Sequence, residues 1–181
     1  AEYNPQTEIT VTAGGTQALA STIAAVVREG DEVIIFTPAY DSYTPVVELH
    51  GGRPVYIKLK FPEYNIDWDE VKMMITRKTR LIIINSPHNP TGTVLKKEDL
   101  DALAHLVANS NILVLSDEVY EHITFDGLPH VSAASHPVLA ERSFVVFSFG
   151  KTFHATGWKL GYVLAPENLM IENLASMSNL V

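Results

Sequence analysis

The sequence predicts an α/β fold built around a mostly parallel sheet. Two observations lead to this prediction. Short apolar runs alternate with segments whose apolar residues recur at helical spacing, and polar segments marked by glycine or proline follow the apolar runs. Connections long enough to hold a helix usually join parallel strands through right-handed crossovers. We therefore expect helices packed on a sheet, in a chain whose 181 residues can form one domain with a full core.

Seven short apolar runs are predicted to form the strands of this sheet. In chain order they are residues 8–12, 32–36, 53–59, 80–84, 111–116, 143–147 and 159–165.

Helices are predicted between these strands from the spacing of apolar residues. One set comprises Leu19, Ile23, Val26 and Val27, and another comprises Leu100, Leu103, Ala104 and Val107. Asp67 followed by Glu70 is typical of a capping box and predicts a helix over residues 68–77. The final stretch, residues 166–180, also has a helical pattern. Trp68 and Trp158 are expected to pack in the core or at its rim.

The composition excludes several classes of protein. No apolar run approaches the roughly 18–20 residues of a membrane-spanning helix, and the first residues lack the pattern of a signal peptide. The net charge of -8 disfavours binding to nucleic acid or to anionic membranes. The chain has no cysteine, which excludes disulfides and thiolate metal sites and suits a cytoplasmic protein. None of the seven histidines pairs at metal-ligand spacing, so we expect no metal.

The segments with unusual polar residues share one position relative to the predicted strands. They are "AGGTQ" after the first strand, "TPAY" after the second, "NSPHNPTG" after 80–84, "DEVY" after 111–116 and "SFGK" after 143–147. In an open parallel sheet, ligands bind outside the carboxyl ends of the strands. Five such segments at one sheet edge predict a ligand site there.

The triplet Gly150-Lys151-Thr152 raises two interpretations of its lysine. As the end of a phosphate-binding P-loop, it would need a glycine five residues before the Gly-Lys pair, but Val145 occupies that position. The segment "ILVLSDE" imitates the acidic strand end that holds Mg²⁺ in nucleotide-hydrolysing enzymes, but the pattern is common. Alternatively, Lys151 is a covalent catalyst that forms a Schiff base with a carbonyl cofactor such as pyridoxal phosphate.

The covalent interpretation needs three further groups, and the same sheet edge offers a candidate for each. Gly14-Gly15-Thr16 begins a helix, where free N–H groups and the helix dipole favour an anion. Asp117 ends a buried strand, where an unpaired carboxylate would be costly. Tyr40 lies in a loop that faces the same crevice. We therefore favour the cofactor interpretation over the nucleotide one.

Five segments together resemble the large domain of class I/II aminotransferases, which are fold-type-I pyridoxal-phosphate enzymes. They are "VTAGGTQAL", "TPAYDSY", "NSPHNPTG", "SDEVYEHITF" and "SFGKTFHATGWKLGYV", and they keep the order and spacing of that family along essentially all of the chain. Within the family, these segments resemble those of methionine and kynurenine/glutamine transaminases. The resemblance implies a three-layer αβα domain, residues 1–181, around a sheet of about seven strands of which one is antiparallel.

The resemblance also implies a role for each site residue. Lys151 would hold the cofactor as a Schiff base and then move a proton, and Asp117 would pair with the pyridinium nitrogen. Asn89 and Tyr120 would hydrogen-bond the cofactor's 3′-oxygen, and Tyr40 would stack on the ring. The phosphate would be bound by Gly15, Thr16, Ser148 and Lys159. The alternatives are bland ones. Lys151, Ser148 and Lys159 could be ordinary surface residues, whereas Asp117 could cap a loop, Asn89 could serve a turn, and Tyr40 and Tyr120 could simply pack.

The resemblance implies further that part of the usual enzyme is missing from this chain. Family members are about twice as long and add a small domain with an arginine that binds the substrate carboxylate. They also have an N-terminal arm that contributes to a homodimer. We therefore expect a large-domain fragment, truncated at both ends, that transaminates poorly alone.

The expected activity of the whole protein is transfer of an amino group from an L-amino acid, methionine-like or aromatic, to a 2-oxo acid. The alternatives are another fold-type-I reaction, such as that of a cysteine-conjugate β-lyase, and a non-catalytic sensor domain.

Overall fold

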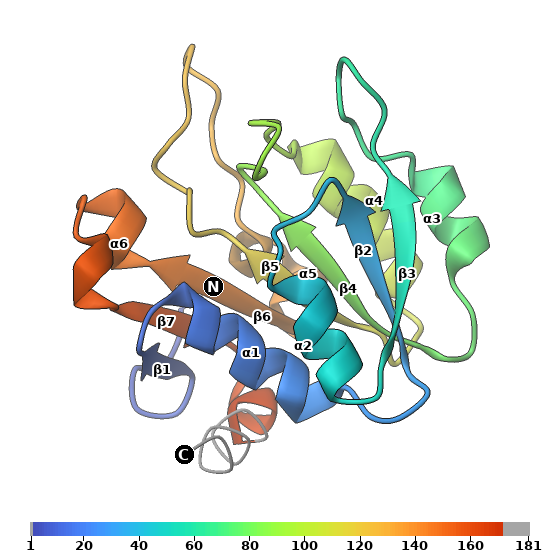
Figure 1. The fold of residues 1–181 in the computed structure, drawn as a ribbon, viewed down its shortest axis with the longest axis horizontal. Coiled ribbons are helices and arrows are strands. Elements are labelled where there is room, and N and C mark those ends of the chain that lie inside the picture. Colours follow the sequence, from blue (N-terminus) through green and yellow to red (C-terminus); the bar gives the residue numbers. More distant parts are fainter. Residues whose placement is uncertain (1, 172–181) are drawn as a thin grey trace.

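The seven predicted strands form one sheet in the computed structural model, which describes residues 2–171 (Figure 1). They are β1 (Ile9–Thr12), β2 (Glu32–Thr37), β3 (Arg53–Lys58), β4 (Thr79–Asn85), β5 (Leu113–Asp117), β6 (Ser143–Ser148) and β7 (Gly161–Leu164). Their order across the sheet is β1-β7-β6-β5-β4-β2-β3. Each strand overlaps the run predicted for it, so the strand predictions are confirmed.

The sheet is parallel except at one strand. β3, β2, β4, β5 and β6 pair in parallel, whereas β7 lies antiparallel between β6 and β1. The expected mixed sheet with a single antiparallel strand is therefore confirmed. Because β7 runs opposite to both neighbours, it begins at the edge where β1 and β6 end.

Helices cover both faces of the sheet. They are α1 (Gly15–Val26), α2 (Tyr43–Leu49), α3 (Trp68–Met74), α4 (Lys97–Val107), α5 (Pro137–Ala140) and α6 (Phe149–Thr152), with 3₁₀ turns η1 (Ala133–Ser135) and η2 (Thr156–Trp158). One buried cluster contains side chains of α1 and α2, and a second contains side chains of α3, α4 and α5, each packed against a different face of the sheet. The three-layer αβα arrangement follows from these two clusters (Figure 1).

The central strands are buried on both faces, which explains their continuous apolar runs. In β4, Leu81 and Ile83 belong to the cluster with α1, whereas Ile82 and Ile84 belong to the cluster with α4. All four side chains are at most 2% exposed. Burial on both faces fixes the register of the central strands and so the place where each strand ends.

The helix starting after Asp67 ends earlier than the sequence predicts. The Asp67 carboxylate accepts hydrogen bonds from the amides of Asp69 and Glu70, as expected of a helix cap. The helix stops at Met74 rather than at residue 77, because Ile75 turns into extended backbone with ψ of 128°. At the other end of the described chain, residues 167–171 are helical, and the rest of the helix expected over 166–180 lies outside the described residues.

The two tryptophans differ in their surroundings. Trp68 packs edge-on against Phe36 and donates its indole N–H to Asp99 at 2.9 Å, so its expected packing role is confirmed. The packing expected for Trp158 is wrong, because its side chain is 83% exposed on the turn η2. Within residues 2–171, no helix is long and apolar enough to cross a membrane.

Candidate active site

A cavity of about 170 Å³ opens at the sheet edge where the parallel strands end. Eight of the residues singled out from the sequence line it, together with Leu19, Asn85 and Val119; the eight are Gly15, Thr16, Tyr40, Asn89, Asp117, Tyr120, Ser148 and Lys151. They come from the last residues of β5 and β6 and from the segments that follow β1, β2, β4, β5 and β6, as the topology predicts.

Asp117 is the buried acid of this cavity. It is the last residue of β5 and is 3% exposed, and the removal of water raises the pKa of its carboxyl from 3.8 to about 6. Two hydrogen bonds lower this pKa and so limit the rise. The Tyr43 hydroxyl donates to Oδ2 at 2.5 Å, and the Val119 amide donates to Oδ1 at 3.3 Å. No arginine or lysine is among the groups that shift this pKa. The site therefore presents a carboxyl group that a cationic ligand atom would stabilise.

Tyr43 and Asn85 support this acid, and the sequence reasoning missed both. Burial and the neighbouring charge of Asp117 hold the pKa of Tyr43 well above 10, so its hydroxyl remains a donor. The Asn85 side chain donates to the backbone oxygen of Asp117 at 2.8 Å and accepts from the Asn89 amide at 2.7 Å. Asn85 ends β4 in register with Asp117, and its position at the end of an apolar strand could have identified it.

Lys151 lies across the cavity on the short helix α6. Its Nζ atom lies 5.3 Å from the centre of the Tyr120 ring, within the range of a cation–π contact. Tyr40 lines the same cavity and packs edge-on against Tyr43, with 5.7 Å between the ring centres. An amine and a buried carboxyl group thus face one cavity that has aromatic rings in its wall.

The start of α1 forms a second, adjoining part of the site. A cavity of about 620 Å³ is lined by Gly15, Thr16, Ser148, Lys151 and Lys159, among others. Lys159, the ninth predicted residue, lines this part and is not among the residues of the smaller cavity. The first amides of a helix have no partner within the helix, and α1 has no side-chain cap on them. This part of the site combines a helix N-terminus with two lysines, which suits an anion.

Two glycines let the chain approach closely enough to build this anion cradle. Gly14 has φ of 87°, a conformation that side chains disfavour, and it turns the chain from β1 into α1. At Gly161, the first residue of β7, an added Cβ would lie 2.8 Å from the carbonyl carbon of Gly14 and 2.9 Å from the nitrogen of Gly15. The turn before α1 can therefore lie directly against β7.

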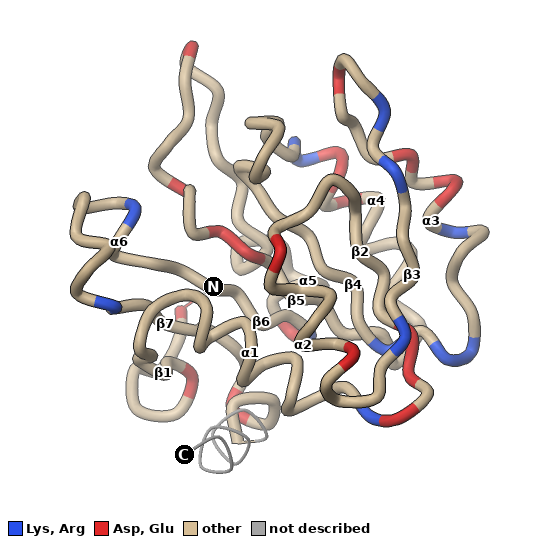
Figure 2. The backbone as a smooth tube through the Cα atoms, viewed as in Figure 1, with Lys and Arg blue, Asp and Glu red and all other residues tan. Residues whose placement is uncertain are grey.

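Four of the five arginines make contacts elsewhere in the fold. Arg28 and Arg142 donate to helix-end carbonyls, Arg53 pairs with the buried Glu32, and Arg80 donates to the carbonyls of Val26 and Asn111. Figure 2 colours lysine and arginine alike, and it shows such positions near the amino ends of β2, β3 and β4 as well as at α6. Among the described residues, no arginine lines either cavity. No group of three or more His, Asp or Glu side chains is placed to hold a metal within this part of the chain.

The family model for aminotransferases of class I and II matches residues 1–181. Methionine aminotransferase from Escherichia coli is 49% identical over 172 residues, which cover 94% of this chain and 45% of that protein. Human kynurenine–oxoglutarate transaminase 1 is 39% identical over 180 residues, covering 93% of this chain and 43% of that protein. The chain thus spans about half the length of the curated relatives it matches.

Solved structures agree with the sequence matches. The crystal structure of YbdL from Escherichia coli, for which a methionine aminotransferase function was identified, superposes with a TM-score of 0.98 at 46% identity. The superposition covers all of this chain and 48% of the YbdL chain. N-succinyldiaminopimelate aminotransferase from Mycobacterium tuberculosis superposes with a TM-score of 0.95 at 40% identity, over 99% of this chain and 47% of that one. The expected fold-type-I fold is confirmed, and the chain belongs to the class I and II aminotransferases.

Proposed function

We propose that this chain is the cofactor-binding large domain of an aminotransferase that moves an amino group from an L-amino acid to a 2-oxo acid. The observation that carries the proposal is the pairing of Lys151 with the buried Asp117 across one cavity. The family depends on pyridoxal 5′-phosphate. The names of the relatives support a methionine-like or aromatic amino acid as the donor substrate.

The residues present fit pyridoxal phosphate group by group. Among residues 2–171, no lysine or arginine acts on the buried Asp117 carboxyl, and a protonated ring nitrogen would supply the cationic partner. Lys151 offers an amine for covalent attachment, and Tyr40 offers a ring surface. The start of α1 with Ser148 and Lys159 suits the phosphate. Asn89 and Tyr120 line the wall between these groups, where they could donate to the 3′-oxygen.

Each of these side chains has a defined task in the proposed reaction. When bound, pyridoxal phosphate supplies an electron-withdrawing ring that stabilises negative charge at the substrate Cα. The Asp117 carboxylate would face the ring nitrogen and favour its protonated form, and the Tyr43 hydroxyl orients that carboxylate. The Lys151 amine would hold the cofactor and, when not attached to it, would hold and move the proton that the substrate Cα loses.

Covalent labelling tests the assignment of Lys151. The natural protein at its full length is mixed with pyridoxal phosphate, reduced with borohydride and digested, and the labelled peptide is identified by mass spectrometry. We expect the label on Lys151 and its loss in Lys151→Ala. Lys159→Ala is the matched control on the same loop, where the label should persist although more cofactor is needed. A label elsewhere, or none on folded protein, would refute the assignment.

Turnover tests the reaction itself. The natural protein should convert methionine or an aromatic amino acid together with a 2-oxo acid. Cofactor binding with no turnover on a broad substrate panel would instead indicate a sensor. Release of a thiol from a cysteine conjugate, with no amino transfer, would indicate a β-lyase.

An exposed apolar patch beside the lysine loop supports a homodimer, which we propose as the partner state. Phe149, Phe153, Ala155, Trp158 and Leu160 line a hollow of about 290 Å³, and Trp158 and Phe153 are 83% and 65% exposed. Exposed aromatic clusters of this kind mark protein interfaces. Trp158→Ser should raise the dimer dissociation constant of the natural protein in sedimentation experiments. The exposed Leu49, changed to serine, is the control on another face.

We also propose a cytoplasmic location, which the cysteine-free composition supports. Fractionation of cells that produce the natural protein tests this location. Recovery in the cytosolic fraction is the expected result, and recovery from a secreted or membrane fraction would contradict it.

A further inference from the structure

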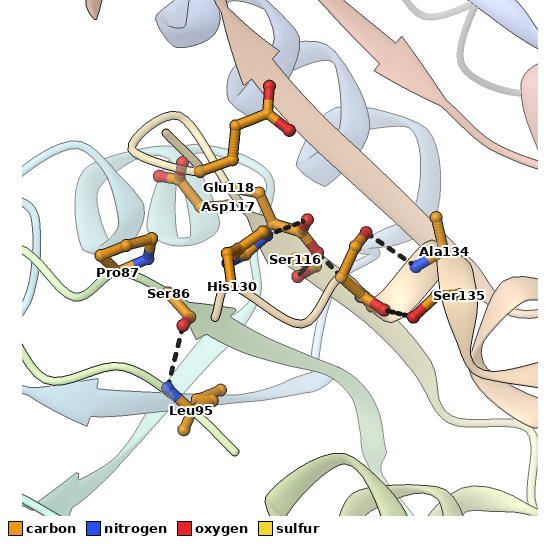
Figure 3. Close-up of polar contacts among 12 residues, drawn as sticks. Ser86, Pro87, Leu95, Ser116, Asp117, Glu118, His130, Ala134 and Ser135 are labelled. Carbon is orange, nitrogen blue, oxygen red and sulfur yellow. Dashed lines mark hydrogen bonds and ion pairs between the residues drawn. The ribbon is translucent and has the colours of Figure 1, made fainter. Parts of the chain in front are cut away.

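Glu118, the residue after Asp117, is the centre of a buried polar network that the proposed chemistry does not use. Its carboxylate accepts hydrogen bonds from the Ser116 hydroxyl at 2.8 Å and from His130 Nε2 at 2.8 Å (Figure 3). It also accepts one from the Ala133 amide at 2.9 Å. Glu118 is 1% exposed, and the side chain of His130 is 11% exposed. A buried carboxylate is tolerated only when it is bonded in this way, so the three donors fix its position.

The same residue begins the turn that carries Tyr120. The Glu121 amide donates to the Glu118 backbone oxygen at 3.0 Å, which places Val119 and Tyr120 at the centre of a β-turn. On the cavity side, the turn is held by the long hydrogen bond from the Val119 amide to the Asp117 carboxylate and by the contact of Lys151 with the Tyr120 ring. On the other side, Glu118 is bound to β6 through its own amide, which donates to Val146.

The network also closes a long loop at its base. After the turn, the chain projects beyond the sheet edge and then returns towards η1 (Figure 1). The tip is exposed, with Phe125 72% accessible. His130 and Ala133 lie on the returning limb, so the Glu118 carboxylate connects the outgoing and returning limbs directly. The outgoing limb, which carries Tyr120, is therefore bound through Glu118 to His130 and Ala133 on the returning limb.

We propose that Glu118 and His130 form a positioning pair for Tyr120. This inference rests on the proposed function, in which Tyr120 donates to the cofactor's 3′-oxygen. Loss of the His130 contact removes one of the two hydrogen bonds that join the Glu118 carboxylate to the returning limb, and leaves the Ala133 amide as the other. The loop that carries Tyr120 is then held less tightly at its base. A hydrogen bond requires a donor–acceptor distance within a few tenths of an ångström, so a small shift of the turn removes Tyr120 from its partner. Neither Glu118 nor His130 lines the cavity, so any effect of the pair on a bound ligand passes through the residues that do line it, of which Tyr120 lies on the turn that Glu118 begins.

Hydrogen exchange of the cofactor-free natural protein tests whether the pair holds the segment. His130→Leu keeps the bulk of the side chain but removes the donor to Glu118. We expect exchange of the amides in residues 119–130 to rise roughly 10- to 100-fold, the factor that follows from losing one hydrogen bond to a charged group. His130→Gln places an N–H near the position of Nε2 and should restore most of the protection. His122→Gln is the control, because His122 is exposed on the same loop and bonded only to Glu121 at 3.5 Å. Unchanged exchange in His130→Leu would overturn the proposal.

A double-mutant cycle tests whether the pair acts through Tyr120. The readout is the pH midpoint of the absorbance change of bound pyridoxal phosphate. Tyr120→Phe should shift this midpoint, His130→Leu should shift it in the same direction, and His130→Leu should add nothing in the Tyr120→Phe background. An equal shift in both backgrounds would overturn the positioning role. A protein that takes up no cofactor would refute the proposed function instead, while the exchange experiment still tests the pair by itself.

Discussion

The buried carboxyl group of Asp117 should make the cofactor-free protein less stable as the pH rises. The folded state holds this proton more tightly than the unfolded chain, since burial raises the pKa of Asp117 from 3.8 to about 6. Between about pH 4 and pH 6 the folded state therefore binds more protons, and the free energy of unfolding falls as pH increases. Each pH unit corresponds to about 1.4 kcal/mol, so the whole effect amounts to about 3 kcal/mol above pH 7. Asp117→Asn removes the charge and with it this loss.

The assay compares urea unfolding of the two cofactor-free proteins at several pH values from 4 to 8. Because both variants share every other titrating group, the difference between their unfolding free energies isolates residue 117. This difference should increase in favour of Asp117→Asn by about 3 kcal/mol between about pH 4 and pH 7. The same substitution at the exposed Asp126 is the matched control. A difference that stays flat, or that favours the wild type as pH rises, would refute the reasoning.

Three further substitutions test the packing and hydrogen bonds around the site. Tyr43→Phe removes the hydrogen bond that stabilises the charged Asp117 carboxylate. The pH at which the unfolding free energy falls because Asp117 loses its proton should therefore rise by about one to two pH units. A midpoint that stays or falls would contradict this. Gly161→Ala forces a Cβ into the backbone before α1 and should lower the free energy of unfolding by about 1–3 kcal/mol in urea titrations. Gly157→Ala, where the space is open, should change it by less than about 0.5 kcal/mol, and equal effects would show that the close approach is unimportant. Asn85→Ala removes the acceptor of the Asn89 amide and one of the two donors to the Asp117 backbone oxygen, and it should cost about 1–3 kcal/mol in thermal melts; a neutral result would mean that water replaces the side-chain amide.

The strands and the general place of the site were predictable because they depend on local patterns. A strand buried on both faces must be apolar throughout, and β4 shows this plainly in Leu81–Ile84. Once the strands are known, the segments after them must meet at one edge of the sheet. The topology therefore predicts that Asp117, at the end of β5, and Lys151, after the end of β6, lie at the same edge of the sheet.

The parts that escaped prediction depend on packing rather than on local pattern. Tyr43 reaches Asp117 because α2 starts at Tyr43 and turns that side chain into the core, whereas the residues of α2 show no apolar period that predicts a helix. Trp158 was expected to pack because it is large and apolar, yet none of the described elements covers the turn on which it lies. The early end of α3 depends on the extended conformation of Ile75, which the capping pattern at the other end cannot indicate.

The direction of β7 determines how residues 149–160, which carry Lys151 and Lys159, are joined to the sheet. Gly161 pairs with Ser148 on one side and with Thr12 on the other, so residues 149–160 leave and re-enter the sheet at the same edge. This connection closes a short ring instead of crossing a face of the sheet, and closing such a ring costs little chain entropy. Residues 149–160, which carry Lys151 and Lys159, therefore form one continuous segment whose two ends are fixed by the adjacent strands β6 and β7. It could be replaced by the corresponding segment of a relative without rerouting any crossover helix.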